Sequence, residues 1–218
     1  MIPKLEKFIF FGTDDFSVQV LEVLKGAEYL PALVVTVPDR PKGRGMNITP
    51  PPAKMWAEHN KILVIQPEVQ NEEMISRIRD LHPDFFIVAS FGKILLGELL
   101  AIPEHGALNV HPSLLPLYRG PTPVQSQILD GAMETGVTLI LMDEKMDHGP
   151  IVAQEKIPMP SPLPTAFELE QKLAYAGGQL LVTAIPKLME GKLEPVEQNH
   201  ALATFTKKFE KEDGLINP

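Results

Sequence analysis

The chain has 218 residues, no cysteine and a formal net charge of -8 at pH 7. A chain of this length can bury one large core without disulfide bonds or structural metal ions. The absence of cysteine excludes disulfide bonds, thiol catalysis and cysteine-ligated zinc. The acidic balance argues against general binding to nucleic acid or to membrane surfaces, so a polyanionic partner would have to meet a local basic region.

The sequence carries no signal for export or membrane anchoring. No apolar run approaches the ~20 residues that span a bilayer. The first residues include Lys4, Glu6 and Lys7, where a secretory signal would be apolar. We therefore expect a cytoplasmic protein with no membrane association, and no pattern indicates an obligate protein partner.

Short apolar runs alternate with segments of helical period through the first 145 residues. The predicted strands are 8–11, 33–37, 63–65, 85–89, 107–111 and 137–142. The predicted helices are 18–24, 53–60, 71–81, 93–100 and 122–131. This alternation predicts an α/β fold of the Rossmann-like kind, with a mostly parallel sheet between flanking helices. Its ligand site is expected at the carboxyl ends of the strands.

The pattern changes after Gly149. Residues 151–155 are typical of an edge strand, which can be antiparallel, and a proline-rich bend covers 158–164. The periodic apolar positions that follow predict a long helix over 165–189, packed on the sheet.

The first strand ends in Gly12, where nucleotide-binding folds often place a phosphate loop. Only one glycine is present, and Asp14 and Asp15 would repel a diphosphate at the helix N-terminus. We therefore predict no dinucleotide cofactor. We expect Asp14, Asp15 or Ser17 to cap the following helix.

A long connection at residues 38–52 reverses the overall sign of the chain. Its cations are Arg40, Lys42 and Arg44, joined by Lys54 just beyond it, against the single carboxylate of Asp39. A solvated loop would explain these charges, but the local reversal favours contact with an anion.

The strongest chemical signal lies at the end of a predicted buried strand. Asn109 and His111 share one face of that strand, and Pro112 ends it at the rim of the expected cleft. If the next strand adjoins it, Asp147 can reach His111 and orient the imidazole. An amide donor, a proton carrier and a supporting carboxylate suit acyl transfer to an amine, where the attacking group belongs to the substrate.

A metal centre is the competing interpretation of the same region. The available ligands would be Glu104, His105, His111, Asp143 and His148. They show neither the His-x-x-x-His nor the His-Glu-x-x-His spacing, so we predict no metal.

At these residues the chain resembles the tetrahydrofolate-dependent formyltransferases. The family shows Asn-x-His followed by Ser-Leu-Leu-Pro, as at 109–116, and a later Asp-x-Gly, as at 147–149. The resemblance implies that Asn109, His111 and Asp147 are catalytic and that the donor is 10-formyltetrahydrofolate. It also implies a folate site lined by the residues of that tetrapeptide, Ser113, Leu114, Leu115 and Pro116.

Two further matches bear on the amine acceptor. Residues 11–16 resemble Gly-Thr-Pro-Asp-Phe, with Asp15 in place of proline, and residues 38–45 reproduce Pro-Asp-Arg-Pro-x-Gly-Arg-Gly. The members of the family that carry these motifs formylate initiator methionyl-tRNA for translation initiation. The resemblance therefore implies tRNA binding by Arg40, Lys42 and Arg44.

The same resemblance gives the expected domain organisation. It implies a catalytic domain over residues 1–204 and a linker over 205–218 that leads toward a C-terminal tRNA-binding domain. One departure, Gly120-Pro121-Thr122-Pro123 in place of Gly-Ala-Ala-Pro, lies on the acceptor side of the expected cleft.

Other functions remain open from the sequence. The family also includes formyltransferases that act on a sugar nucleotide or on glycinamide ribonucleotide, and a deformylase would use water in place of the amine. A non-catalytic folate-binding domain is the alternative from another class, although binding alone needs no proton carrier.

Overall fold

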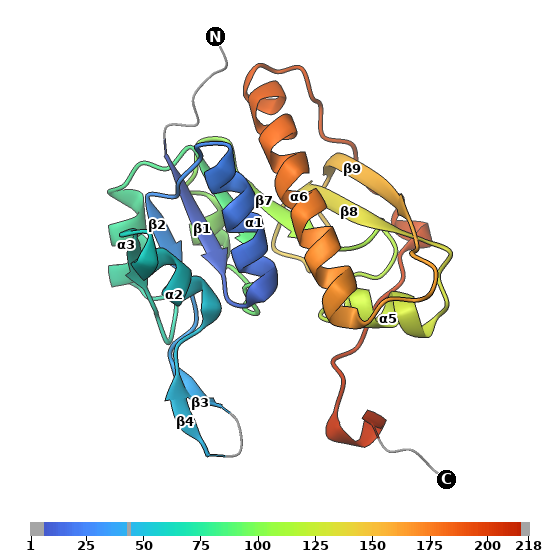
Figure 1. Ribbon diagram of the computed structural model, residues 1–218. Coiled ribbons are helices and arrows are strands. Elements are labelled where there is room, and N and C mark those ends of the chain that lie inside the picture. The colour runs from blue at the N-terminus through green and yellow to red at the C-terminus, as the bar shows by residue number, and fades with distance from the viewer. Residues whose placement is uncertain (1–6, 43–44, 215–218) are drawn as a thin grey trace.

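The computed structural model describes residues 7–42 and 45–214 (Figure 1). Its strands are β1 (Phe8–Gly12), β2 (Leu33–Val35), β3 (Arg40–Lys42), β4 (Asn47–Thr49), β5 (Leu63–Ile65), β6 (Phe85–Ala89), β7 (Ala107–His111), β8 (Glu134–Leu141) and β9 (Ile151–Pro158). Its α-helices are α1 (Asp15–Gly26), α2 (Pro52–His59), α3 (Glu72–Arg79), α4 (Gly97–Leu100), α5 (Pro123–Leu129) and α6 (Ala166–Met189).

Seven of these strands form one sheet in the order β5-β2-β1-β6-β7-β8-β9. The strands from β5 to β7 run parallel, whereas β8 is antiparallel to β7 and β9 is antiparallel to β8. The predicted fold class is confirmed, including the antiparallel strands near the end of the order and the edge position of β9.

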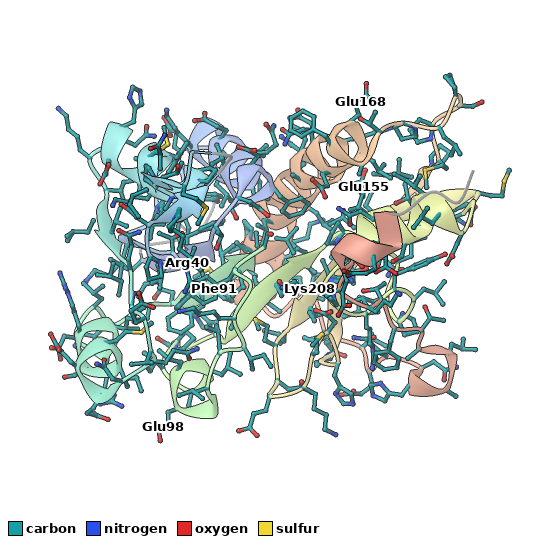
Figure 2. The ribbon with its side chains drawn as sticks, turned by 90° about the horizontal axis from the view of Figure 1, so that it is seen from below. Arg40, Phe91, Glu98, Glu155, Glu168 and Lys208 are labelled. Atoms are coloured by element: carbon teal, nitrogen blue, oxygen red, sulfur yellow. The ribbon has the colours of Figure 1, made fainter. Side chains whose placement is uncertain are left out.

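The sheet is buried on both faces because its central strands are apolar throughout. In β1, Phe8 and Phe10 enter the core cluster that contains residues of α1, α2 and α6, whereas Ile9 and Phe11 enter the cluster formed with α3 and α4. This two-residue alternation distributes the helices over the two faces. Figure 2 shows the result at the margins, where Glu98 of α4 and Glu168 of α6 lie on opposite sides of the molecule.

The long C-terminal helix closes the larger core. The prediction of a helix over 165–189 is confirmed by α6, whose N-terminus carries a capping box between Thr165 and Glu168. In Figure 1, α6 lies beside α1 on the same side of the sheet. The two helices approach closely at Gly178, where a Cβ atom would lie 2.6 Å from the Cβ of Val23.

Three segments differ from their predictions. The 38–52 connection contains the β3–β4 hairpin, which projects from the body in Figure 1. Strand β8 begins at Glu134 because its first residues pair with the end of β9. The helix predicted over 93–100 covers only α4, because Lys93 Nζ and the Leu96 amide bond to the neighbouring 67–70 loop.

One predicted capping arrangement is confirmed at the start of α1. The Asp14 carboxylate accepts a hydrogen bond from the Ser17 amide at 3.3 Å. Within the described ranges, no helix has the length and apolar character required to cross a membrane.

Candidate active site

A cavity of about 460 Å³ lies where β1, β6 and β7 end and where the loop after β8 returns toward them. Asp14 and Ser90 line it from the ends of β1 and β6, and His111 lines it from the end of β7. Its apolar side chains include Val88, Phe91, Leu95, Ile140 and Met142. Figure 2 shows Phe91 within the body of the molecule. The position agrees with a ligand site at the carboxyl ends of parallel strands.

Three polar side chains meet in this cavity. Asn109 Nδ2 lies 3.3 Å from Asp147 Oδ1, and His111 Nδ1 lies 3.5 Å from the same oxygen. Their convergence follows from the sheet, because antiparallel β8 lies beside β7 and the loop after it carries Asp147 back over them. The predicted meeting of these three residues is confirmed, and their catalytic roles stay a prediction.

The two ring nitrogens of His111 have different surroundings. Nε2 lies 2.9 Å from the carbonyl oxygen of Tyr118. A carbonyl oxygen only accepts hydrogen bonds, so this contact requires the hydrogen to be on Nε2. The other ring nitrogen, Nδ1, faces the carboxylate of Asp147. His111 is 4% exposed, so its ring is shielded from bulk water.

The Asp147 turn is held in an unusual conformation. Its second carboxylate oxygen, Oδ2, accepts a hydrogen bond from the Gly120 amide at 2.7 Å. Asp147 has a φ of 49°, in the left-handed region. Two residues later, a Cβ on Gly149 would lie 1.8 Å from the carbonyl oxygen of Leu141. The Asp-x-Gly spacing therefore has a steric reason.

The predicted folate residues Ser113, Leu114, Leu115 and Pro116 do not line this cavity. Ser113 is fully buried, and its hydroxyl donates to the Leu117 carbonyl at 2.6 Å. The Leu115 amide donates to Thr138 Oγ1 at 3.1 Å. In the structure these residues form the turn that leads to the Tyr118 carbonyl beside His111. Their folate contacts stay a prediction.

Several lining residues were missed from the sequence. Phe91 and Leu95 belong to the segment after β6, part of which was predicted to form a helix over 93–100. Phe91 packs edge-on against Phe11, with ring centroids 5.4 Å apart. Its apolar, aromatic character directly after a buried strand was the available signal.

Glu170 was also missed, because it lies on α6, far along the chain from the other lining residues. Burial raises the pKa of its carboxyl, and the nearby carboxylates of Asp14 and Asp15 raise it further. The Gln125 amide opposes this shift by donating to Glu170 Oε1 at 2.8 Å. One wall of the cavity is therefore acidic.

Two of the predicted tRNA-binding residues, Arg40 and Lys42, lie on strand β3 of the hairpin. Arg40 is exposed and lies 3.8 Å from Glu68, an ion pair that contributes little in water. Lys42 ends β3. Arg44 lies outside the described residues. Lys54, counted with these cations, is paired with Asp39 at 2.8 Å and does not add free positive charge.

Of the possible metal ligands, His148 and Asp143 pair with each other at 2.6 Å. The His148 ring stacks on His200 with centroids 4.1 Å apart. In the part of the chain that the structure describes, no group of three or more His, Asp or Glu side chains is placed to hold a metal ion.

The sheet topology, the cavity and the three converging side chains agree with the formyl transferase class that the sequence resembles. Residues 6–185 match the family model described as formyl transferase, and the chain belongs to this family.

Among its curated relatives are methionyl-tRNA formyltransferases. The enzyme from Chloroflexus aurantiacus is 44% identical over 212 residues, which cover 97% of this chain and 68% of that protein. The enzyme from Halalkalibacterium halodurans is also 44% identical over 212 residues, covering 97% of this chain and 67% of its own length.

Solved structures share the fold. An N-formyltransferase from Helicobacter canadensis, in complex with folinic acid and dTDP-3-aminofucose, is 25% identical with a TM-score of 0.69, covering 97% of this chain and 72% of that one. A phosphoribosylglycinamide formyltransferase from Bacillus halodurans is 22% identical with a TM-score of 0.67, covering 84% of this chain and 95% of that one.

Proposed function

We propose that this chain transfers a formyl group from 10-formyltetrahydrofolate to the amino group of methionine esterified to initiator tRNA. The observation that supports methionyl-tRNA as the acceptor is the 44% identity, over 97% of the chain, to a protein named methionyl-tRNA formyltransferase. The meeting of Asn109, His111 and Asp147 in one cavity supports the chemistry.

The reaction needs an amine nitrogen to attack the formyl carbon while the bond between that carbon and N10 of the folate breaks. Asn109 donates one amide hydrogen to Asp147, and its second Nδ2 hydrogen is available for the formyl oxygen as negative charge develops there. A hydrogen-bond donor aimed at such an oxygen lowers the activation barrier by ~3 kcal/mol in enzymes that catalyse acyl transfer.

Protons must also move for the atoms to balance. The attacking amine loses one proton, and N10 of the departing folate gains one. His111 Nδ1 takes up the first and returns one to the leaving nitrogen, while Nε2–H stays on the Tyr118 carbonyl. The Asp147 carboxylate stabilises the imidazolium that forms between these events.

The size and lining of the cavity support a folate donor. Its volume of about 460 Å³ lies within the range of small-molecule sites, ~300–1,000 Å³. A flat heteroaromatic ring suits the apolar wall formed with Phe91, Leu95 and Met142. In this proposal the wall shares the folate site with residues 113–116.

The acceptor would reach the cavity with help from the projecting hairpin. We propose that Arg40, Lys42 and Arg44 contact tRNA phosphates, since the chain as a whole is acidic. We also propose residues 1–204 as the catalytic domain and 205–218 as the lead toward a tRNA-binding domain. Tyr118 and Thr122 donate hydrogen bonds to residues 204–207, and these bonds tie the start of that lead to the site.

The test compares acceptors. Purified chain is incubated with 10-formyltetrahydrofolate and with methionyl initiator tRNA, a dTDP-amino sugar or glycinamide ribonucleotide, and the formylated product is measured by mass spectrometry. We expect product with the charged tRNA and at least 100-fold slower transfer to the small amines. Faster transfer to either small amine would reassign the acceptor, and donor binding without transfer to any amine would indicate a folate-binding domain.

A further inference from the structure

The segment that follows α6 runs back against the candidate active site, and we refer to residues 196–206 as the strap. Val196 and Ile151 exchange backbone hydrogen bonds of 2.8 Å, which attach one end of the strap to β9. At the other end, the Arg119 amide donates to the Thr204 carbonyl at 2.9 Å and the Thr206 amide donates to the Arg119 carbonyl at 2.7 Å. The strap is therefore fixed on both sides of the Asp147 turn.

Gln198 is the strap residue that contacts this turn. Its Nε2 donates to the carbonyl oxygens of Asp147 at 3.0 Å and of Gly149 at 2.7 Å. Its Oε1 accepts a hydrogen bond of 2.6 Å from the Arg119 guanidinium. Gln198 is 5% exposed, so these contacts form away from water, where an unpaired amide would be costly.

The turn needs such support because Asp147 has a φ of 49°. A non-glycine residue in the left-handed region persists where its surroundings hold it. The two carbonyl groups that Gln198 binds lie on either side of His148, directly after the strained residue. A shift of this turn would carry the Asp147 carboxylate away from both Asn109 and His111.

Arg119 determines which way the Gln198 amide faces. The guanidinium only donates, so it requires the oxygen of the amide on its own side and leaves Nε2 toward the turn. Arg119 is itself held, since it is 3% exposed and a second contact joins its guanidinium to His200 Nδ1 at 2.9 Å. The residue after it, Gly120, donates its amide to Asp147 Oδ2.

We infer that Gln198 is a positioning residue of the active site, which sets the Asp147 carboxylate against Asn109 and His111 through the Asp147 and Gly149 carbonyl groups. This inference rests on the proposed formyl transfer. It makes the strap part of the catalytic apparatus and not only a connection that leaves the domain.

Two substitutions separate the contacts of Gln198 in the full chain. Gln198→Met keeps the approximate volume and removes all three hydrogen bonds. Gln198→Glu keeps the acceptor for Arg119 but turns a carboxylate oxygen toward the two carbonyl groups. Asn71→Ala is the matched control for lost stability, because it removes the cap of α3 outside the cavity lining.

The readouts are kcat, the KM for 10-formyltetrahydrofolate and the hydrogen exchange rate of the Gly120 amide. We expect both Gln198 variants to lose at least about 10-fold in kcat, because small displacements of catalytic groups have effects of up to ~100-fold. The KM should stay within about twofold, and Gly120 exchange should be at least about 10-fold faster than in the control. Asn71→Ala should keep the parent kcat and Gly120 exchange.

Unchanged kcat and unchanged Gly120 exchange in folded Gln198 variants would overturn the inference. If neither variant folds, Gln198→Asn takes their place. Its side chain is shorter by one methylene group, and kcat and Gly120 exchange are measured in the same way. Absence of formyl transfer in the parent chain would instead overturn the proposed function, while the exchange of Gly120 still tests whether Gln198 holds the turn.

Discussion

Lys54 Nζ lies 2.8 Å from Asp39 Oδ2 and joins the first turn of α2 to the base of the β3–β4 hairpin. Gln66 Nε2 donates to Asp39 Oδ1 at 2.6 Å and to the Val37 carbonyl at 2.8 Å. Hydrogen bonds from Gln66 and then from Lys54 hold the pKa of the Asp39 carboxyl below its ordinary value. These contacts set the direction in which the hairpin leaves the body.

Substituting Lys54→Met should raise the pKa of Asp39 toward its ordinary value, because one of the two donors and the cation are lost. A lowered pKa stabilises the folded protein above the unfolded-state value of ~3.9, and this contribution is lost as pH falls through the folded-state value. NMR titration of the Asp39 carboxyl in both proteins measures the change. The same titration midpoint in the variant would show that Lys54 does not act on Asp39.

Replacing Arg40 and Arg44 together by Gln should raise the KM for methionyl-tRNA and leave the KM for the folate donor unchanged. Each lost phosphate contact should also reduce the slope of log K against log salt by about 1. Steady-state kinetics at several salt concentrations give both quantities. If the double variant keeps the salt slope of the parent protein, Arg40 and Arg44 do not contact the tRNA.

Asn109→Ala and His111→Ala should each lower kcat by ~10²-fold or more, because they remove the proposed oxyanion donor and the proposed proton carrier. Circular dichroism and thermal unfolding check that the fold is intact. Near-normal turnover in both folded variants would reject the catalytic assignment.

Gly149→Ala should destabilise the protein by about 3 kcal/mol, because the added Cβ would lie 1.8 Å from the Leu141 carbonyl oxygen. Gly26→Ala is the matched control, since no atom lies within 4 Å of its added Cβ and Gly26 ends a helix. The free energy of unfolding of the control should rise by ~0.5–1 kcal/mol. Denaturant unfolding compares the two, and equal stabilities would contradict the close approach at Gly149.

Glu170→Gln should raise Tm at pH 7. Burial and the Asp14 and Asp15 carboxylates raise the pKa of Glu170, so its ionised form weakens the folded state at pH values above its folded-state pKa. The neutral amide removes this effect, and the gain should disappear as pH falls toward ~4, where Glu170 is protonated in the parent. We expect a rise of about 1–2 °C by calorimetry at pH 7. The same Tm difference at pH 4 and at pH 7 would contradict this explanation.

Much of the fold could be predicted because its strands have unmistakable local patterns. The continuous apolar runs at 8–11 and 85–89 predicted strands buried on both faces. The hairpin was missed because Pro41, Gly43 and Gly45 are typical of loops. The pairing of Arg40 with Thr49 depends on two segments that are separated in the sequence, and no local pattern indicates it.

The site was predictable where side chains carry the chemistry. Asn109 and His111 lie on one face of a strand because alternate residues do so. The prediction that Asp147 reaches them needed only the assumption that the next strand lies beside theirs. The Tyr118 carbonyl and the Gly120 amide could not be predicted, since backbone groups have no residue signature. Gln198 could not be predicted either, because its contact depends on the strap folding back against the site.

The antiparallel pairing of β7 with β8 concentrates the reacting groups in a short stretch of chain. Asn109 and Asp147 are 38 positions apart, whereas the hairpin and the strap lie outside that stretch. The proposed catalytic residues and the proposed tRNA-binding residues thus lie in different portions of the polypeptide, while Gln198 of the strap contacts the Asp147 turn. A substitution in the hairpin would therefore leave the arrangement of Asn109, His111 and Asp147 in place, which gives evolution a route to new acceptors.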